Sequence, residues 1–165
     1  MLKEELIRGL NEDLAAEWGT IIRYTYQAGK SFGLVGAELR EIFQHEGQDE
    51  LGHAPFLTDV IIDLGGEPTT TPKEFARPES LKAMLELELD MESKDVANYT
   101  QRAKQAEELG EVELKVKLEE MAADEAGHAR ELRREHVRIV QANQQSIAFN
   151  MLYPYPEPKA RVRAA

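Results

Sequence analysis

The stretch "DELGHAPF", residues 49–56, places Glu50 and His53 three residues apart in a segment with a helical pattern. Residues at positions i and i+3 of a helix share one face, so both side chains point the same way. The same face continues as an apolar stripe through Leu57, Val60 and Leu64. A carboxylate and an imidazole therefore stand where the sequence predicts the core, and their presence there needs a chemical reason.

The stretch "DEAGHARE", residues 124–131, repeats this arrangement with Glu125 and His128. Each pair follows another glutamate by the same interval, since Glu17 precedes Glu50 by 33 residues and Glu92 precedes Glu125 by 33. A tyrosine follows each of these earlier glutamates by seven residues, as Tyr24 and Tyr99. The two halves of the chain thus share one pattern, displaced by 75 residues, which indicates an internal repeat of a helical hairpin.

The apolar periodicity predicts four helices, over about residues 2–28, 35–64, 79–109 and 111–141. Glycines end the first and third helices, and the stretch 65–80 is rich in helix breakers and long enough to carry the chain along a bundle. The predicted fold is all-α, a four-helix bundle of two hairpins joined by a long crossover. We expect residues 1–142 to form the bundle and the proline-rich residues 143–165 to form an extended tail.

Distances along the helices from the two hairpin turns place the four glutamates and two histidines at nearly the same depth. Burying ionised carboxylates costs on the order of several kcal/mol per ion, and no lysine or arginine occupies the matching stripe positions. Two divalent cations cancel four negative charges, and two neutral imidazoles complete the coordination. A nitrogen and oxygen donor set without sulfur suits iron(II) or manganese(II), and zinc fits it without redox chemistry.

Composition narrows the function classes further. The formal net charge of −11 argues against a nucleic-acid surface, and no apolar run is long enough to span a bilayer. The absence of cysteine excludes disulfides, thiolate metal sites and thiol catalysis, and fits a reducing compartment. Since the N-terminus also carries no apolar signal segment, we expect a cytoplasmic protein with neither nucleic-acid nor membrane partners.

The segments "LNEDLAAEWGTIIRY", "FQHEGQDELGHA" and "DEAGHARE" resemble the ferritin-like superfamily, and bacterioferritins most closely. The resemblance covers roughly residues 1–140. It implies that one iron is bound by Glu17 and His53 and the other by Glu92 and His128, with Glu50 and Glu125 bridging. It also implies that Tyr24 donates a hydrogen bond beside the centre and can donate one electron, and that His45 and Asp49 match an accessory iron site.

The sequence departs from the bacterioferritin pattern at two places. Leu51 stands where the haem-ligating methionine of bacterioferritins follows the glutamate, so haem is not expected. The proline-rich tail replaces the short fifth helix of storage cages, which puts a 24-subunit shell in doubt. Rubrerythrins, the next resemblance, carry an extra carboxylate where Asp95 stands, but their cysteine-containing iron module has no counterpart in this sequence.

Several residues have a structural reading beside the functional one. Glu88 is an alternative third-helix ligand whose depth fits less well than that of Glu92, and Tyr99 is more simply a core residue whose hydroxyl reaches a partner. Trp18 is expected to serve packing or an interface rather than electron transfer, and His136 to lie at the surface or the end of the bundle. "HEGQD" lacks the second histidine of a zinc-protease motif, which excludes that assignment.

The sequence therefore predicts a non-haem di-iron protein that oxidises Fe(II) with dioxygen or hydrogen peroxide. Its alternatives are a rubrerythrin-like peroxide reductase with an external electron donor, a non-catalytic iron-storage subunit, and a purely structural bundle. Iron ions and the oxidant are the expected partners, and a homo-oligomer, a dimer or larger, is the expected assembly.

Overall fold

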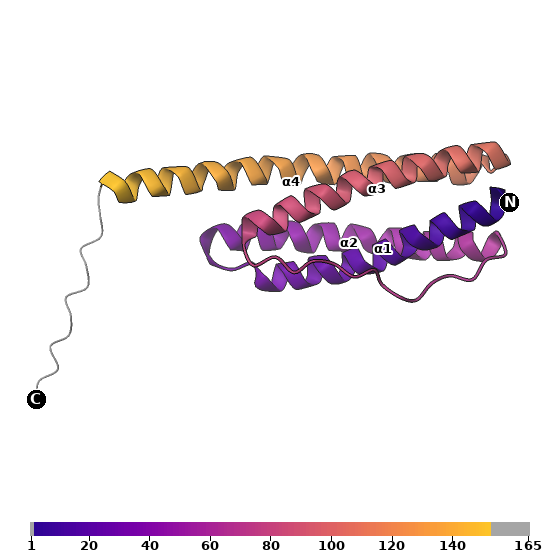
Figure 1. The fold of residues 1–165 in the computed structure, drawn as a ribbon, viewed down its shortest axis with the longest axis horizontal. Helices are drawn as coiled ribbons and strands as arrows, with labels where there is room; N and C mark the ends of the chain where they lie inside the picture. Colours follow the sequence, from indigo (N-terminus) through magenta and orange to yellow (C-terminus); the bar gives the residue numbers. More distant parts are fainter. Residues whose placement is uncertain (1, 153–165) are drawn as a thin grey trace, which may run out of the picture.

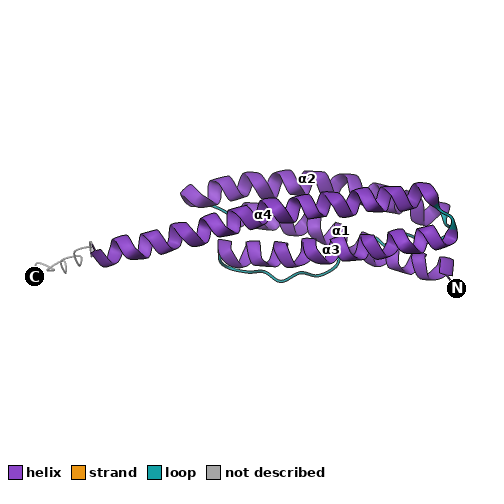
Figure 2. Ribbon diagram, turned by 90° about the horizontal axis from the view of Figure 1, so that it is seen from above, coloured by secondary structure: helices purple, strands orange, loops and turns teal. Residues whose placement is uncertain are grey.

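The structure, a computed structural model, describes the backbone of residues 2–152 and the side chains of residues 2–33 and 36–142. It contains four helices: α1 (Leu2–Lys30), α2 (Gly33–Asp63), α3 (Leu81–Leu109) and α4 (Val112–Leu152). The helices lie side by side along one long axis (Figure 1, Figure 2), and the described residues include no strand. The predicted all-α bundle is confirmed.

Two hairpins build the bundle. Helix α1 packs mainly on α2 and α3 on α4, and the hairpins meet along α1–α3 and α2–α4. The connection between α2 and α3 runs along the bundle from the end where α2 stops to the end where α3 starts (Figure 1). Its Lys73 N–H donates to the carbonyl of Ala15 at 2.7 Å, so the connection is fastened to α1. Gly19 permits this approach, because a Cβ there would lie 2.6 Å from the Lys73 carbonyl oxygen.

The helix ends follow the signals that the sequence carries. Gly110 adopts a positive φ of 77° after α3, and the N–H of Glu111 donates to the carbonyl of Ala106 at 2.9 Å. This is the arrangement that glycine favours at a helix C-terminus, where it satisfies free carbonyl groups. At the start of α3, the Ser80 hydroxyl accepts the N–H of Ala83 at 3.2 Å.

Helix α4 is longer than the sequence pattern predicts. We expected it to end near residue 141, but it continues to Leu152, so the predicted domain boundary at residue 142 falls inside a helix. The reason is local, since no glycine or proline occurs between Gly127 and Pro154 to end the helix. The rest of the predicted tail, residues 153–165, lies outside the described residues.

The apolar core forms two clusters rather than one. One contains Leu6, Leu10 and Leu57 with Leu118, and the other contains Phe43 and Leu85 with Leu132. Buried polar side chains fill the level between them, which is where the sequence predicts the metal ligands. No helix in the described part of the chain is both long and apolar enough to cross a membrane.

Candidate metal centre

Six side chains from four helices meet at the middle of the bundle. Helix α1 supplies Glu17 and α3 supplies Glu92. Helix α2 supplies Glu50 and His53, and α4 supplies Glu125 and His128. Their donor atoms form two groups of four, and within each group all four atoms lie within 4.8 Å of one another. The first group consists of Glu17, Glu50, His53 and Glu125. The second group consists of Glu50, Glu92, Glu125 and His128. Glu50 and Glu125 belong to both groups, so the two groups overlap along one shared side.

Both histidines face the carboxylates through Nδ1. The Nδ1 atom of His53 lies 3.1 Å from Glu50 Oε2 and 3.1 Å from Glu125 Oε1. The Nδ1 atom of His128 lies 3.1 Å from Glu125 Oε2 and 3.9 Å from Glu92 Oε2. In both halves of the chain, the i, i+3 spacing thus brings the histidine against the glutamate of the same Glu-x-x-His motif, as the helical pattern predicts.

Among the described residues, the four carboxylates are buried without a lysine or arginine partner. Glu17, Glu50, Glu92 and Glu125 are at most 3% exposed. In the described part of the chain, no lysine or arginine forms an ion pair with them, and Glu17 Oε2, Glu92 Oε2 and Glu125 Oε1 accept no hydrogen bond. Such unsatisfied buried acceptors are rare and need an explanation. Oxygen and imidazole donors that converge in this way fit two divalent metal ions.

Proton affinities at the centre reflect the crowding of like charges. Burial, with the negative charge of Glu50, raises the pKa of Glu17 well above its ordinary value, and burial with Glu125 does the same for Glu92. Burial raises the pKa of Glu50 to about 8. Burial also acts to raise the pKa of Glu125, but the close contacts of its carboxylate with the His128 and His53 imidazoles outweigh burial and lower that pKa to about 2. Without metal, the centre therefore holds protons that bound cations would displace.

Two tyrosines bond crosswise to the outer carboxylates. Tyr24 on α1 donates to Glu92 Oε1 on α3 at 2.5 Å, and Tyr99 on α3 donates to Glu17 Oε1 on α1. The hydroxyl of Tyr99 was expected to reach a partner, and that partner is a candidate ligand. The signal was present in the sequence, because Tyr99 is related to Tyr24 by the 75-residue repeat.

Glu88, the alternative ligand on α3, is already paired. Arg23 Nε donates to its two oxygens at 2.8 and 2.9 Å, and Gln27 donates to Oε1 at 2.7 Å. On the other side of the centre, Arg102 Nε donates to Asp13 Oδ2 at 2.9 Å. Sequence reasoning missed both pairs, although Asp13 and Glu88 are themselves related by the repeat.

A third acidic group lies on α2 beside the centre. Donor atoms of His45, Glu46 and Asp49 lie within 4.8 Å of one another, and this group includes the predicted accessory pair. Glu46 is buried, whereas His45 and Asp49 are exposed. Glu46 was given no role from the sequence, although its position two helical turns before His53 was a visible signal.

Three other singled-out residues lie outside the two donor groups. Asp95 is half-buried, and burial together with the charge of Glu125 raises its pKa to about 7. Trp18 is partly buried against the apolar core, and His136 is half-buried with Nε2 3.4 Å from Glu86 Oε1. These positions agree with the packing and peripheral roles expected for Trp18 and His136.

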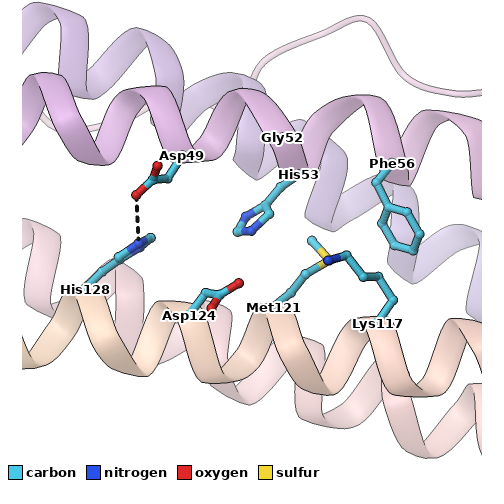
Figure 3. A pocket seen from close by; sticks show the side chains of 8 residues that line it. All are labelled: Asp49, Gly52, His53, Phe56, Lys117, Met121, Asp124 and His128. Carbon is cyan, nitrogen blue, oxygen red and sulfur yellow. Dashed lines mark ion pairs between the residues drawn. The ribbon is translucent and has the colours of Figure 1, made fainter.

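A cavity of about 400 Å³ lies between α2 and α4 next to the two histidines. Its lining includes His53, Asp49 and Phe56 from α2 and His128, Asp124 and Met121 from α4 (Figure 3). In this view His53 and His128 point from opposite helices into the space between them. The donor groups are therefore buried but adjoin an opening large enough for water, ions and small oxidants.

Comparisons with known proteins agree with this geometry. The structure resembles that of a ferritin-like, diiron-carboxylate protein from Bacillus anthracis str. Ames, with a TM-score of 0.79 and 42% identity over 81% of this chain and 96% of that one. It also resembles the bacterioferritin of Desulfovibrio desulfuricans, whose structure shows a diiron site in different catalytic states, with a TM-score of 0.80 and 24% identity over 89% and 86% of the two chains.

Sequence comparison leads to the same relatives. The bacterioferritin of D. desulfuricans is 27% identical over 127 residues, which are 76% of this chain and 71% of that protein. The family described as the ferritin-like domain matches residues 7–141. The resemblance drawn from the Glu-x-x-His repeat is confirmed, and the chain belongs to the ferritin-like family.

Proposed function

We propose that the mid-bundle centre binds two iron ions and oxidises Fe(II) with dioxygen or hydrogen peroxide. The observation that carries this proposal is the pair of overlapping donor groups, which share Glu50 and Glu125 and contain no lysine or arginine among the described residues. The diiron-carboxylate relative from B. anthracis, 42% identical, supports iron as the metal. Manganese or zinc fits the same donors, and haem is not part of the proposal.

The ligand assignment follows the two groups. Glu17 and His53 would hold one iron, Glu92 and His128 the other, and Glu50 and Glu125 would bridge them. The shared membership of Glu50 and Glu125 supports their bridging role. The unsatisfied oxygens of Glu17, Glu92 and Glu125 are the atoms left free for metal.

Two Fe(II) ions supply two electrons, which together with two protons reduce one hydrogen peroxide to two waters, or reduce dioxygen to hydrogen peroxide. The protein's own contribution is charge balance, orientation and exclusion of water. Four carboxylates match the charge of two divalent ions, and the two apolar clusters limit water access from either end of the bundle. Tyr24 is placed to donate a hydrogen bond that orients the carboxylate of Glu92.

Anaerobic titration of the metal-free protein with Fe(II), followed by addition of peroxide or air, tests the proposal. Wild-type protein should bind two Fe(II) per chain and oxidise both, whereas Glu50→Ala should lose stoichiometric binding. Glu88→Gln is a matched control, because Glu88 is an equally buried α3 carboxylate that contacts Arg23 rather than the donor groups, and it should still bind two. Retention of two Fe(II) by Glu50→Ala would contradict the assignment.

Storage and peroxide reduction are separate versions of this function. A measurement of native mass tests the storage function, because a dimer cannot enclose a mineral whereas a cage can. The similar thioferritin from Bacteroides fragilis is dodecameric. A homo-oligomer is part of the proposal. The peroxide-reductase alternative draws support from Asp95, which is half-buried near Glu125. Peroxide turnover that consumes a reductant while Fe(II) stays catalytic would favour this alternative.

A further inference from the structure

We propose that Glu46 is a positioning residue for His128, and that it makes the His128 side of the centre differ from the His53 side. This inference rests on the proposed metal centre. Glu46 lies on α2 and is 1% exposed. Its Oε2 atom lies 3.1 Å from His128 Nε2, across the gap between α2 and α4, and accepts no hydrogen bond from the described residues.

The two nitrogens of His128 face different surroundings. Nδ1 lies 3.1 Å from Glu125 Oε2, inside a donor group, whereas Nε2 points away from that group toward Glu46. A neutral imidazole carries one proton, so a ring that gives the Nδ1 lone pair to a metal must carry its proton on Nε2. Glu46 Oε2 is then the nearest acceptor, since Asp49 Oδ2 lies farther away at 3.7 Å.

A carboxylate in this place orients the ring and increases the basicity of the metal-binding nitrogen. Partners of this kind commonly change metal affinity by about 10–100-fold when they are removed. The pairing also explains why a carboxylate is buried at Glu46, where the described part of the chain offers neither lysine nor arginine as a partner. The unsatisfied oxygen of Glu46 acquires a donor when the His128 tautomer is fixed.

The other half of the repeat lacks this feature. The residue displaced by 75 positions from Glu46 is Met121, which is fully buried on α4 and lines the same cavity as His53 (Figure 3). In the described part of the chain, the Nε2 atom of His53 has no carboxylate partner, because all ion-pair contacts of that ring are made by Nδ1. We therefore expect the two metal positions to differ in affinity, with the His128 position bound more tightly.

Anaerobic titration of the metal-free protein with Co(II), followed by calorimetry and by visible absorption of the bound ion, tests this role. Wild type should bind two Co(II) with separable affinities. Glu46→Met should still bind two, with the tighter site weakened about 10–100-fold. Glu46→Gln should recover part of that loss, because its amide oxygen still accepts from Nε2. Met121→Leu is the matched control at the repeat-related position, and should leave both affinities unchanged.

Double variants show whether the effect passes through His128. In a His128→Ala background, Glu46→Met should change nothing further, whereas in a His53→Ala background it should keep its full effect. Urea unfolding of each metal-free variant verifies that it is folded.

Three results would overturn the role of Glu46 while leaving the centre intact. They are unchanged affinities in Glu46→Met, an equal effect in the His128→Ala background, and loss of a third bound ion, which would make Glu46 a direct ligand. Wild-type protein that binds fewer than two Co(II) would instead overturn the proposed centre together with this role.

Discussion

Two kinds of buried carboxylate occupy neighbouring levels of this bundle, and their surroundings differ sharply. Glu88 and Asp13 each accept hydrogen bonds from an arginine, Arg23 and Arg102. Glu17, a single turn from Asp13 on α1, instead lies among Glu50, Glu125 and His53 and accepts a hydrogen bond from the Tyr99 hydroxyl. A difference of one helical turn thus separates carboxylates that the chain neutralises by itself from carboxylates that it leaves for a cation.

This contrast explains why Glu88 is a poor candidate ligand although it is fully buried. A buried ion pair that is hydrogen-bonded on both sides is neutral as a unit, and it offers no free oxygen to a metal. The mid-bundle carboxylates are the opposite case, because three of their oxygens accept no hydrogen bond within the described structure. Burial alone therefore does not separate Glu88 from Glu17, because both are buried; the difference between them is the arginine that pairs with Glu88.

The largest effect is expected from breaking an arginine pair. Arg23→Met leaves Glu88 as an unpaired buried charge and should lower the free energy of unfolding by about 3–5 kcal/mol. Urea unfolding of the metal-free protein at neutral pH measures this loss. The double variant Arg23→Met with Glu88→Leu should recover most of it, because no charge is then left unpaired. Wild-type stability in the single variant would contradict the contrast drawn here.

The next effect concerns the mid-bundle carboxylates. Saturating Co(II) or Zn(II) should stabilise the wild type by about 2.7 kcal/mol per ion at a hundredfold excess over the dissociation constant. Glu17→Gln should remove much of this gain but leave the metal-free protein as stable as wild type, because the raised pKa of Glu17 already favours its neutral form. Thermal unfolding with and without metal measures the stability of the metal-free protein and the gain on metal binding. If the metal-free Glu17→Gln protein were destabilised as much as the Arg23→Met protein, the two regions would be alike.

The stability of the metal-free protein should fall between pH 5 and pH 8. The pKa of Glu50 rises from 4.5 to about 8 on folding, so in this range the folded chain binds more protons than the unfolded one, and unfolding becomes easier as pH rises. Glu46, with a pKa raised by burial to about 7, acts in the same direction. The contribution of Glu125 to stability has the opposite sign, because its pKa is lowered on folding. This contribution changes with pH only below about pH 4.5.

The arginine-paired region should contribute less to this trend. Burial raises the pKa of Asp13 only to about 6, because Arg102 opposes the shift, so its contribution ends at lower pH. Saturating metal should flatten the trend, since bound ions replace the protons. Unfolding free energies at pH 5, 6, 7 and 8 with and without Co(II) measure this. Equal slopes in the two series would contradict proton displacement at the centre.

The smallest effects are expected from the two tyrosines. Tyr99→Phe removes the hydrogen bond to Glu17, which is worth about 1 kcal/mol, and should weaken one ion less than tenfold without changing the number bound. Tyr24→Phe, its repeat-related counterpart at Glu92, should have a similar effect on the other ion. Calorimetric Co(II) titration compares them. Loss of a whole ion in either variant would show that the hydroxyl does more than support its carboxylate.

The sequence alone predicted much of this molecule. Residues repeated at 33 and 75 positions predicted two hairpins and one common depth for Glu17, Glu50, Glu92 and Glu125. These features can be predicted because the periodicity and the rise per residue of a helix are regular. The spacing of residues along the chain therefore gives both the helix face that they share and their position along the bundle axis. The end of α4 was predicted near residue 141, too early, because the first helix breaker after Gly127 is Pro154 and the helix continues to Leu152.

Only the tertiary structure decided which buried carboxylate meets which partner. Nothing in the spacing of Glu88 and Arg23, 65 residues apart, shows that they bond, nor that Glu46 reaches His128 across the bundle. Such pairings depend on how the hairpins rotate and approach each other, which the packing of side chains on all four helices determines together. Local sequence spacing thus determines which helix face each ligand occupies and how deep in the bundle it lies. Whether a buried carboxylate is a metal ligand or is paired with an arginine is decided only when the helices pack.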